Sequence, residues 1–467
     1  MPSVSIPGAP AGGRRQGSSQ TLQEAVYCWL VSGVAAIAGL LFGFDIAVIN
    51  GAIVFLRAQF HLNDFQTEVA VSFLLMGCIA GAAIAGWLAD RYGRRRVLSI
   101  SALLFGVSSL AAALPRTFAE FGAARMIGGV AIGIASMVAP LYIAEVAPAH
   151  IRGRLVTLNQ MAIVTGILLA YFTNWALSFS GAASWRWMFA VAVVPALALF
   201  AGLFLAPESP RWLMEKGREG DARAVLERME GVEEGPAQAR RIRETLHHQA
   251  GTLEELFTPA LRRPLYLIMA LAVLQQITGI NTVLFYGSLL WEREFRSHGH
   301  SSAIGMNTMI GLVNFAVTLL ALWLIERSGR RALLMFSSGG MAICQLLLGL
   351  VFRMRTPPAF FMLGSILLCV AAFAVGLGPV TWTLMAELLP TNVRGKAMSL
   401  ANMALWIASC ALTFTFLSLL HAVTATGAFC LYSFLCGLTF VLVWKLAPET
   451  KGRTLEEIEE FWRKERR

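Results

Sequence analysis

Charged side chains are scarce in this sequence. Asp, Glu, Lys and Arg make up 14% of its 467 residues, and 57% of the residues are hydrophobic. A soluble domain usually carries roughly 25% charged residues, and with so few of them it could not cover this much apolar surface. The composition therefore excludes an ordinary soluble globular protein and favours one whose solvent is a lipid bilayer.

Motifs for covalent and metal chemistry are also missing. The seven cysteines lie singly within apolar stretches, and their spacing excludes a disulfide framework or a metal-binding motif. No nucleophile elbow and no phosphate-binding loop occurs, so we predict neither an enzyme nor a bound cofactor. Residues 1–25 contain no apolar core, and we expect no cleaved signal peptide.

Long apolar runs, by contrast, are abundant. A membrane-spanning helix needs about 20 mainly apolar residues. Twelve such runs occur, at 27–56, 66–89, 97–115, 118–145, 153–178, 185–206, 262–291, 302–325, 332–352, 358–389, 396–420 and 426–446. They predict an all-α membrane protein with twelve transmembrane helices.

Three short charged phrases between these runs occur twice, at offsets of 236, 242 and 241 residues. The first copies are DRYGRRR at 90–96, EVAP at 145–148 and APESPR at 206–211, and the second copies are ERSGRR at 326–331, ELLP at 387–390 and APETKGR at 447–453. Repetition of this kind is how many transporter folds are built. It predicts two six-helix bundles, at 27–206 and 261–446, with a tail at 1–26, a linker at 207–260 and a tail at 447–467. Within the linker we expect amphipathic helices at 221–229 and 237–248.

The net charge of +10 results from where the basic residues lie. Arginine and lysine gather after the even-numbered runs, although Arg353 and Arg355 are exceptions. The positive-inside rule then places these junctions and both termini in the cytoplasm. We therefore interpret the basic balance as a topology signal, not as a surface for nucleic acid.

Five motifs in order resemble one known family. They are the R-x-G-R-R element after the second and eighth runs, PESPR at 207–211, PETKG at 448–452 and QQITGIN at 275–281. This set is typical of the sugar porters of the major facilitator superfamily. The chain resembles the bacterial proton-coupled xylose and glucose porters and, more distantly, the animal facilitative glucose transporters. The resemblance implies a monomer in a bacterial inner membrane, with a central site for a sugar that opens alternately to each side.

The repeated charges predict a network at the cytoplasmic helix ends. Acids lie at matched positions in both halves beside arginine clusters, where pairing across helices could latch the inner faces together. Exposed pairs contribute about 0–1 kcal/mol each, so only a network would bias the equilibrium. The alternative is that the arginines only set topology. The predicted network is Asp90, Arg94, Arg95, Glu145, Arg152, Glu208, Arg211, Glu326, Arg330, Arg331, Glu387, Arg394 and Glu449.

Uncharged amides inside the seventh run fit a sugar ligand. Gln275, Gln276 and Asn281 can both donate to and accept from hydroxyl groups without the desolvation cost of a charge. On an unbroken helix Gln275 and Asn281 would point about 120° apart. We expect Gly279 to let the helix unwind so that all three face one cavity.

Further site residues follow from the resemblance. It implies that Gln160 and Asn314 are sugar-binding amides and that Trp382 is a stacking indole. A possible gate or site rim comprises Phe285, Tyr286, Gly378, Pro379 and Trp406. For an isolated intramembrane amide the alternative is hydrogen bonding between helices, worth about 0.6–2 kcal/mol.

Departures from the family pattern bear on the substrate. Ile167 stands where the xylose-type porters have a second glutamine, Ala374 where the animal transporters have an acid, and Leu405 where relatives have an amide. The site is therefore less polar than in either group, and we favour D-glucose or a related hexose. The alternatives are a facilitative sugar uniporter, a D-xylose porter, a porter of a non-sugar solute and a sugar sensor.

An acid and an arginine lie inside the membrane runs. Asp45 lies within the first run and Arg125 within the fourth, both below the outer helix ends. An intramembrane carboxylate is a functional candidate, because keeping it ionised in lipid is costly. A nearby arginine lowers a carboxylate pKa and burial raises it, so this pair could hold and release the coupling proton. The alternative is a static buried ion pair.

Overall fold

All regular secondary structure in the described residues is helical. The computed structural model describes residues 14–148, 151–247, 253–259, 261–294, 300–354, 359–389 and 391–451. The first half contains α1 (Arg14–Phe60), α2 (Asp64–Tyr92), α3 (Arg94–Ala113), α4 (Phe118–Val146), α5 (Arg152–Leu177), α6 (Ser184–Ala190) and α7 (Val193–Leu205). The linker contains α8 (Pro210–Glu215), α9 (Glu219–His247) and α10 (Leu253–Leu256). The second half contains α11 (Arg262–Ile277), α12 (Ile280–Glu294), α13 (His300–Ser328), α14 (Arg330–Val351), α15 (Ala359–Val375), α16 (Pro379–Glu387) and α17 (Thr391–Leu446).

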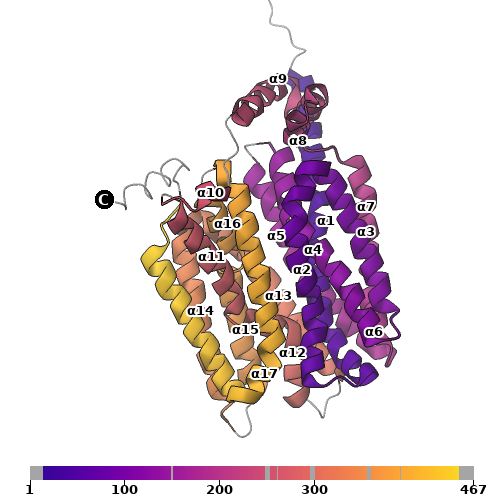
Figure 1. Ribbon diagram of the computed structural model, residues 1–467, viewed down its shortest axis with the longest axis vertical. Helices are drawn as coiled ribbons and strands as arrows, with labels where there is room; N and C mark the ends of the chain where they lie inside the picture. Colours follow the sequence, from indigo (N-terminus) through magenta and orange to yellow (C-terminus); the bar gives the residue numbers. More distant parts are fainter. Residues whose placement is uncertain are drawn as a thin grey trace, which may run out of the picture.

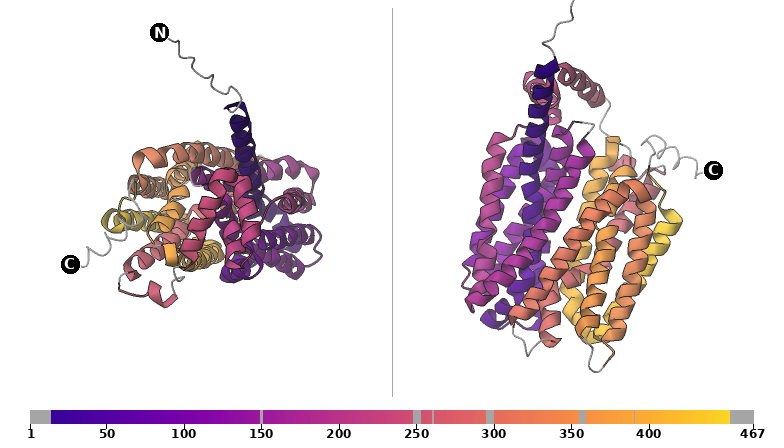
Figure 2. Two further views of the ribbon diagram at one scale, coloured as in Figure 1. Left: turned by 90° about the horizontal axis from the view of Figure 1, so that it is seen from above. Right: turned by 180° about the vertical axis from the view of Figure 1, so that it is seen from behind.

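The helices pack as two bundles that stand side by side (Figures 1 and 2). In the first bundle α1 packs on α5 and α2 on α4, and in the second α17 packs on α14 and α11. The halves meet where α2 contacts α17, α5 contacts α13 and α1 contacts α12. Polar side chains that lie at these contacts can therefore join or release the two halves.

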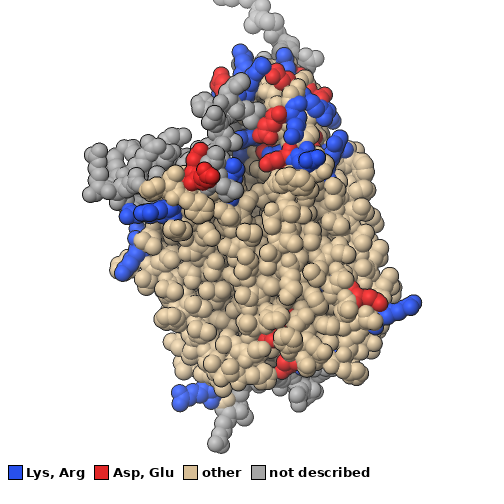
Figure 3. Space-filling view, in the orientation of Figure 1, with Lys and Arg blue, Asp and Glu red and all other residues tan. Residues whose placement is uncertain are grey.

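The two ends of the molecule differ in charge. Helices α8 to α10 cover one end, which we call the linker end, and we call the opposite end the far end (Figure 1). On the face shown in Figure 3, Lys, Arg, Asp and Glu gather at the linker end and recur sparsely at the far end, and other residues form the broad middle band. Such a band is what a surface in contact with hydrocarbon requires.

The number of membrane spans depends on one backbone break. Eleven helical stretches of the described residues are long and apolar enough to cross a bilayer, and the last of these, Gly395–Leu446, has 52 residues. Since about 20 residues suffice for one crossing, this stretch holds two. Thr424, at φ 65°, breaks it between them. The fold therefore has twelve spans, as the sequence predicts.

Two other breaks differ from the sequence prediction. The run at 185–206 is divided between α6 and α7, because Pro195 lacks the N–H that a continuous helix needs and its ring crowds the carbonyl of Val191. In the linker, α9 is continuous through 231–236, the segment between the two helices expected at 221–229 and 237–248. Only Gly231 leaves the helical region there, at φ 90°, so two helices join directly at a kink.

Candidate functional site

Three of the predicted sugar-binding amides meet at a break between α11 and α12. Gly279 at the break has a φ of 86°, a region that glycine enters without steric cost. Asn281 then comes back over the end of α11, where its Nδ2 donates to Gln276 Oε1 at 2.5 Å. Gln276 Nε2 donates in turn to Gln275 Oε1 at 3.3 Å. The expected unwinding at Gly279 therefore occurs, and it brings all three amides together.

Backbone carbonyl groups at the helix breaks in this region accept hydrogen bonds from buried glutamine side chains. Gln275 Nε2 donates to the carbonyls of Leu377 and Gly378, at 2.6 and 3.2 Å, just before α16 begins. Gln345 of α14 donates from Nε2 to the Thr278 carbonyl at 3.0 Å. Leu377 and Gly378 lie between α15 and α16, and Thr278 lies between α11 and α12, so the two glutamines stabilise the broken geometry by donating to carbonyls at the breaks. Gln275, one of the predicted sugar ligands, thus has a structural role through its Nε2 group.

The remaining predicted ligands lie on neighbouring helices. Gln160 is half-buried on α5, Asn314 is buried on α13 and Trp382 is half-buried on α16. Helix α5 packs on α13, and α16 contacts both α13 and α11. Among the described side chains no hydrogen bond links these three residues to the amides of α11 and α12. A ligand with several hydroxyl groups is the kind of molecule that could connect them.

The predicted rim residues lie on α12, on α17 and at the start of α16. Phe285 and Tyr286 are buried on α12, where the Tyr286 hydroxyl donates to the Thr413 carbonyl at 2.8 Å. Trp406 of α17 is buried, and its ring meets that of Phe42 from the other half at 5.6 Å. Gly378 and Pro379 form the start of α16 beside Gln275, with Gly378 as the N-cap and Pro379 as the first helical residue. Of these rim residues, Trp406 therefore makes an aromatic contact between the halves.

The ion pair predicted inside the membrane is formed. An Arg125 nitrogen of α4 bonds to the Asp45 carboxylate of α1, and Arg125 Nη2 donates to the Asp45 carbonyl at 2.9 Å. Both residues are buried, and the guanidinium lies 5.0 Å from the ring centre of Phe189. A Cβ on Gly128 would lie 3.1 Å from Asp45 Oδ2. The glycine therefore lets α4 approach the carboxylate closely.

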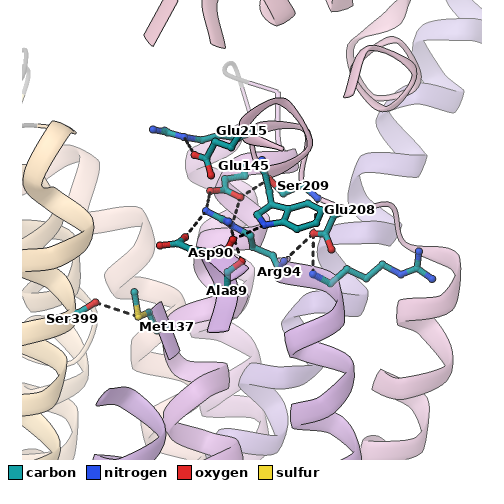
Figure 4. A network of polar contacts seen from close by, with 12 residues as sticks. Ala89, Asp90, Arg94, Met137, Glu145, Glu208, Ser209, Glu215 and Ser399 are labelled. Atoms are coloured by element: carbon teal, nitrogen blue, oxygen red, sulfur yellow. Dashed lines mark hydrogen bonds and ion pairs between the residues drawn. The ribbon is translucent and has the colours of Figure 1, made fainter. Parts of the chain in front are cut away.

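The first copy of the charge network joins α2, α3, α4 and α8 (Figure 4). Arg94 Nε lies 3.0 Å from Glu145 Oε2, and Arg94 Nη2 lies 3.4 Å from Asp90 Oδ1. Glu208 accepts the backbone N–H groups of Arg94 and Arg95 at 2.9 and 3.1 Å. Glu208 thereby caps α3, because an acid at a helix N-terminus satisfies unpaired N–H groups and the helix dipole.

The second copy repeats this geometry in the other half. Arg330 Nη2 lies 3.0 Å from Glu387 Oε1. Glu449 accepts the N–H groups of Arg330 and Arg331 at 3.0 and 3.1 Å and so caps α14. Thr450 donates to Glu387 at 2.6 Å, as Ser209 does to Glu145 at 2.5 Å in the first half.

The described ion pairs of this network stay within their own halves. Arg152 donates to the Ala147 carbonyl at 3.3 and 3.4 Å, and Arg211 lies 3.5 Å from Glu215. The side chains of Glu326 and Arg394 lie outside what the structure describes. In this state the network braces the linker end of each bundle separately.

Sequence reasoning missed a buried polar cluster that joins the halves. Asn50 of α1 donates to the Leu284 carbonyl at 2.7 Å and accepts from the N–H and hydroxyl of Ser288 at 2.8 and 2.7 Å. Asn307 donates to Ser288 at 2.8 Å, and the Tyr171 hydroxyl donates to the Leu284 carbonyl at 3.0 Å. An asparagine within an otherwise apolar span was the available signal, but its partners lie more than 230 residues away in the chain.

Comparisons with known proteins agree with this architecture. The family described as "Sugar (and other) transporter" matches residues 31–462. The glucose transport protein of Synechocystis is 37% identical over 466 residues, which cover 94% of this chain and 98% of the relative. The arabinose-proton symporter of Bacillus subtilis is 35% identical over 440 residues, which cover 93% and 94%. The solved structure of a proton:xylose symporter bound to 6-bromo-6-deoxy-D-glucose superposes with a TM-score of 0.82 at 35% identity, covering 94% of this chain and 100% of that chain.

These similarities extend over nearly the whole chain and both bundles, and the matched structure has the major facilitator fold. The prediction of twelve transmembrane helices in two six-helix bundles is confirmed. The chain belongs to the sugar transporter family of the major facilitator superfamily, and it is an integral membrane transporter rather than an enzyme.

Proposed function

We propose that the protein is a proton-coupled monosaccharide transporter that works by alternating access. The carrying observation is the group of uncharged amides at the broken α11–α12 helix, which lies in a chain similar to sugar-proton symporters. Gln276 and Asn281 offer donors and acceptors to sugar hydroxyls. Gln160, Gln275, Asn314 and Trp382 complete the site in this proposal, with Trp382 stacking on the sugar ring.

The substrate is proposed to be D-glucose or a related hexose. Ile167, Ala374 and Leu405 are all buried apolar residues, and the resemblance implies that one or another group of related porters has a polar side chain at each of these positions. Apolar walls leave fewer hydrogen-bonding partners and suit a ligand held mainly by the α11–α12 amides. A D-xylose porter and a facilitative uniporter are the alternatives that the uptake experiment distinguishes.

Proton coupling is assigned to Asp45 and Arg125. The buried carboxylate lies against a guanidinium and has no other charged partner among the described side chains. A change in the distance between α1 and α4 would alter the free energy of the ionised carboxylate. A transport cycle that moves the two helices would thereby bind the proton in one state and release it in another.

The membrane orientation follows from the charge asymmetry. In this proposal the linker end is cytoplasmic, both termini are cytoplasmic and the membrane is a bacterial inner membrane. The functional unit is a monomer with bundles at 27–206 and 261–446, the linker at 207–260 and tails at 1–26 and 447–467.

Uptake into proteoliposomes tests the proposal. Labelled glucose, xylose, arabinose and an organic cation are offered with and without an inward proton gradient. We expect glucose to accumulate above its external concentration only with the gradient. Equal equilibration with and without the gradient would indicate a uniporter, and absence of uptake of every sugar would contradict the proposal.

A further inference from the structure

The far ends of α2 and α17 hold the two halves together through a buried carboxylate. Glu68 of α2 is fully buried. Its Oε1 accepts the backbone N–H of Ser418 at 2.7 Å, and its Oε2 accepts the Ser418 hydroxyl at 2.8 Å. A carboxylate removed from water needs such donors in return. Here a single residue of the opposite half supplies both of them.

A second polar contact lies one helical turn nearer the far end. Asp64 Oδ2 of α2 lies 2.6 Å from His421 Nε2 of α17, and Asp64 Oδ1 lies 2.7 Å from Arg57 Nη2 of α1. The His421 side chain is 64% exposed and that of Asp64 is 30% exposed. This contact is therefore open to solvent, unlike the one at Glu68.

An aromatic contact lies beside the two polar ones. The rings of Phe65 and Phe414 meet edge to face at 5.6 Å, again from α2 to α17. Asp64 and Glu68 are four residues apart, and Ser418 and His421 are three apart, so each pair shares one face of its helix. The three contacts form a continuous strip between the halves at the far end.

The linker end lacks a comparable strip in the part of the chain that the structure describes. The described hydrogen bonds between the halves there run from Ser399 to the Met137 sulfur and from Asn402 to Ser136, both at 3.4 Å. Figure 4 includes the first of them. The two ends are thus joined unequally, and the strong contacts are those that must break if the far end opens.

We propose that Glu68 and Asp64 form a clamp on Ser418 and His421 that holds the far end shut and sets the balance between the two transport states. The inference rests on the proposed alternating-access function. When the halves part, Glu68 exchanges its two donors for water, so the clamp contributes only to the closed state. Glu68 acts as a positioning residue, because it acts through α17 and does not touch the sugar site.

The distance between the far ends of the two halves tests the clamp. Spin labels are placed on the full-length protein in lipid nanodiscs at Arg116→Cys and Val423→Cys, in a background without the native cysteines. Glu68→Gln and Ser418→Ala should each raise the ratio of long to short distances by roughly tenfold, because a hydrogen bond to a charged group is lost. Together they should do little more than either alone.

Thr67→Val is the matched control. Thr67 is buried next to Glu68, but its hydroxyl donates to the Asn63 carbonyl near the start of its own helix, at 2.8 Å. This variant should leave the distance ratio unchanged.

The outcomes separate the clamp from the transport function. If wild type shows two distances and neither Glu68→Gln nor Ser418→Ala changes their ratio, the clamp is overturned. Alternating access would then be unaffected. A single distance in wild type, with or without sugar and in every variant, would count against alternating access as well. Sugar binding measured on the same samples shows that the variants are folded.

Discussion

At the scale of residues, Asn281 and Gln276 are the most exacting test of the sugar site. Asn281 donates to Gln276 at 2.5 Å and to Ser409 at 3.2 Å. Removing either amide should cost about 0.5–1.5 kcal/mol of sugar binding, or up to about tenfold in Kd. Calorimetry on Gln276→Ala and Asn281→Ala checks this, and unchanged Kd values for every transported sugar would refute the site.

Trp382→Ala should weaken binding more than either amide substitution. It removes both a stacking face and an indole N–H, and Trp382 lies half-buried on α16. Calorimetry with glucose measures the loss. Trp444→Ala is the control, because Trp444 is exposed on the outer surface of α17 and should leave the Kd unaltered.

The residues predictable from the sequence are those whose chemistry is unusual for their surroundings. Asp45 and Arg125 stand out as charges in apolar runs, and the structure pairs them. Gln345 and Asn50 also stood in apolar runs, yet their roles depend on which carbonyls face them. Spacing along the chain carries no record of such partners, so these roles could not be predicted.

At the scale of elements, the break between α11 and α12 depends on Gly279. At a φ of 86°, a Cβ would also lie 2.5 Å from the Tyr432 ring. Gly279→Ala should therefore lower stability by about 1–3 kcal/mol and weaken sugar binding. A thermal melt and a binding titration measure both effects.

Gly437→Ala provides the comparison for that substitution. Gly437 lies in α17, where a Cβ would meet nothing within 4 Å. It should raise or preserve the melting temperature, because alanine favours a helix over glycine. If Gly279→Ala behaved in the same way, the break would not require glycine.

The repeated motifs predicted some contacts of the charge network and missed others. Matched acids and arginines predicted that Glu145 and Glu387 would meet arginines, and they meet Arg94 and Arg330. The capping of α3 and α14 by Glu208 and Glu449 was not predicted. Each of these acids lies more than 110 residues along the chain from the helix that it caps. The spacing of the motifs does not indicate which helix end such a distant residue contacts.

Glu387→Gln tests whether this network affects transport states. It removes the charge pair with Arg330 while leaving an oxygen for Thr450 to donate to. The closed state of the linker end should weaken by about 0–1 kcal/mol, up to about fivefold in population. Labelling of Ser399→Cys from the linker side should then speed up, whereas Glu215→Gln, at an exposed pair, should leave the rate unchanged. An unchanged rate in Glu387→Gln would mean that the charges only set topology.

At the scale of the whole molecule, the duplicated phrases predicted two bundles because each half needs the same junctions between its helices. The apolar runs predicted the number of spans because each membrane crossing needs about 20 mainly apolar residues. What they did not determine is how the halves meet. Contacts such as Glu68 to Ser418 join residues 350 positions apart, and they belong to one state of a molecule that has at least two in the proposed cycle.

Coupling between proton and sugar is the property that involves both bundles, and Asp45→Asn tests it. Asparagine keeps the shape of the side chain and an oxygen for Arg125, but it cannot bind or release the proton. The variant should bind sugar and exchange it across the membrane, yet fail to concentrate it on an inward proton gradient. Counterflow and gradient-driven uptake in the same proteoliposomes measure the two activities.

The alternative role for Asp45 makes a different prediction. If the pair only held α1 to α4, loss of its charge would leave a buried Arg125 uncompensated, at a cost of about 3–5 kcal/mol. Asp45→Asn would then melt at a much lower temperature and lose exchange together with accumulation. A normal melt and normal exchange without accumulation would separate proton binding from simple bracing. An Asp45→Asn protein that still concentrated sugar would show that the coupling proton binds elsewhere.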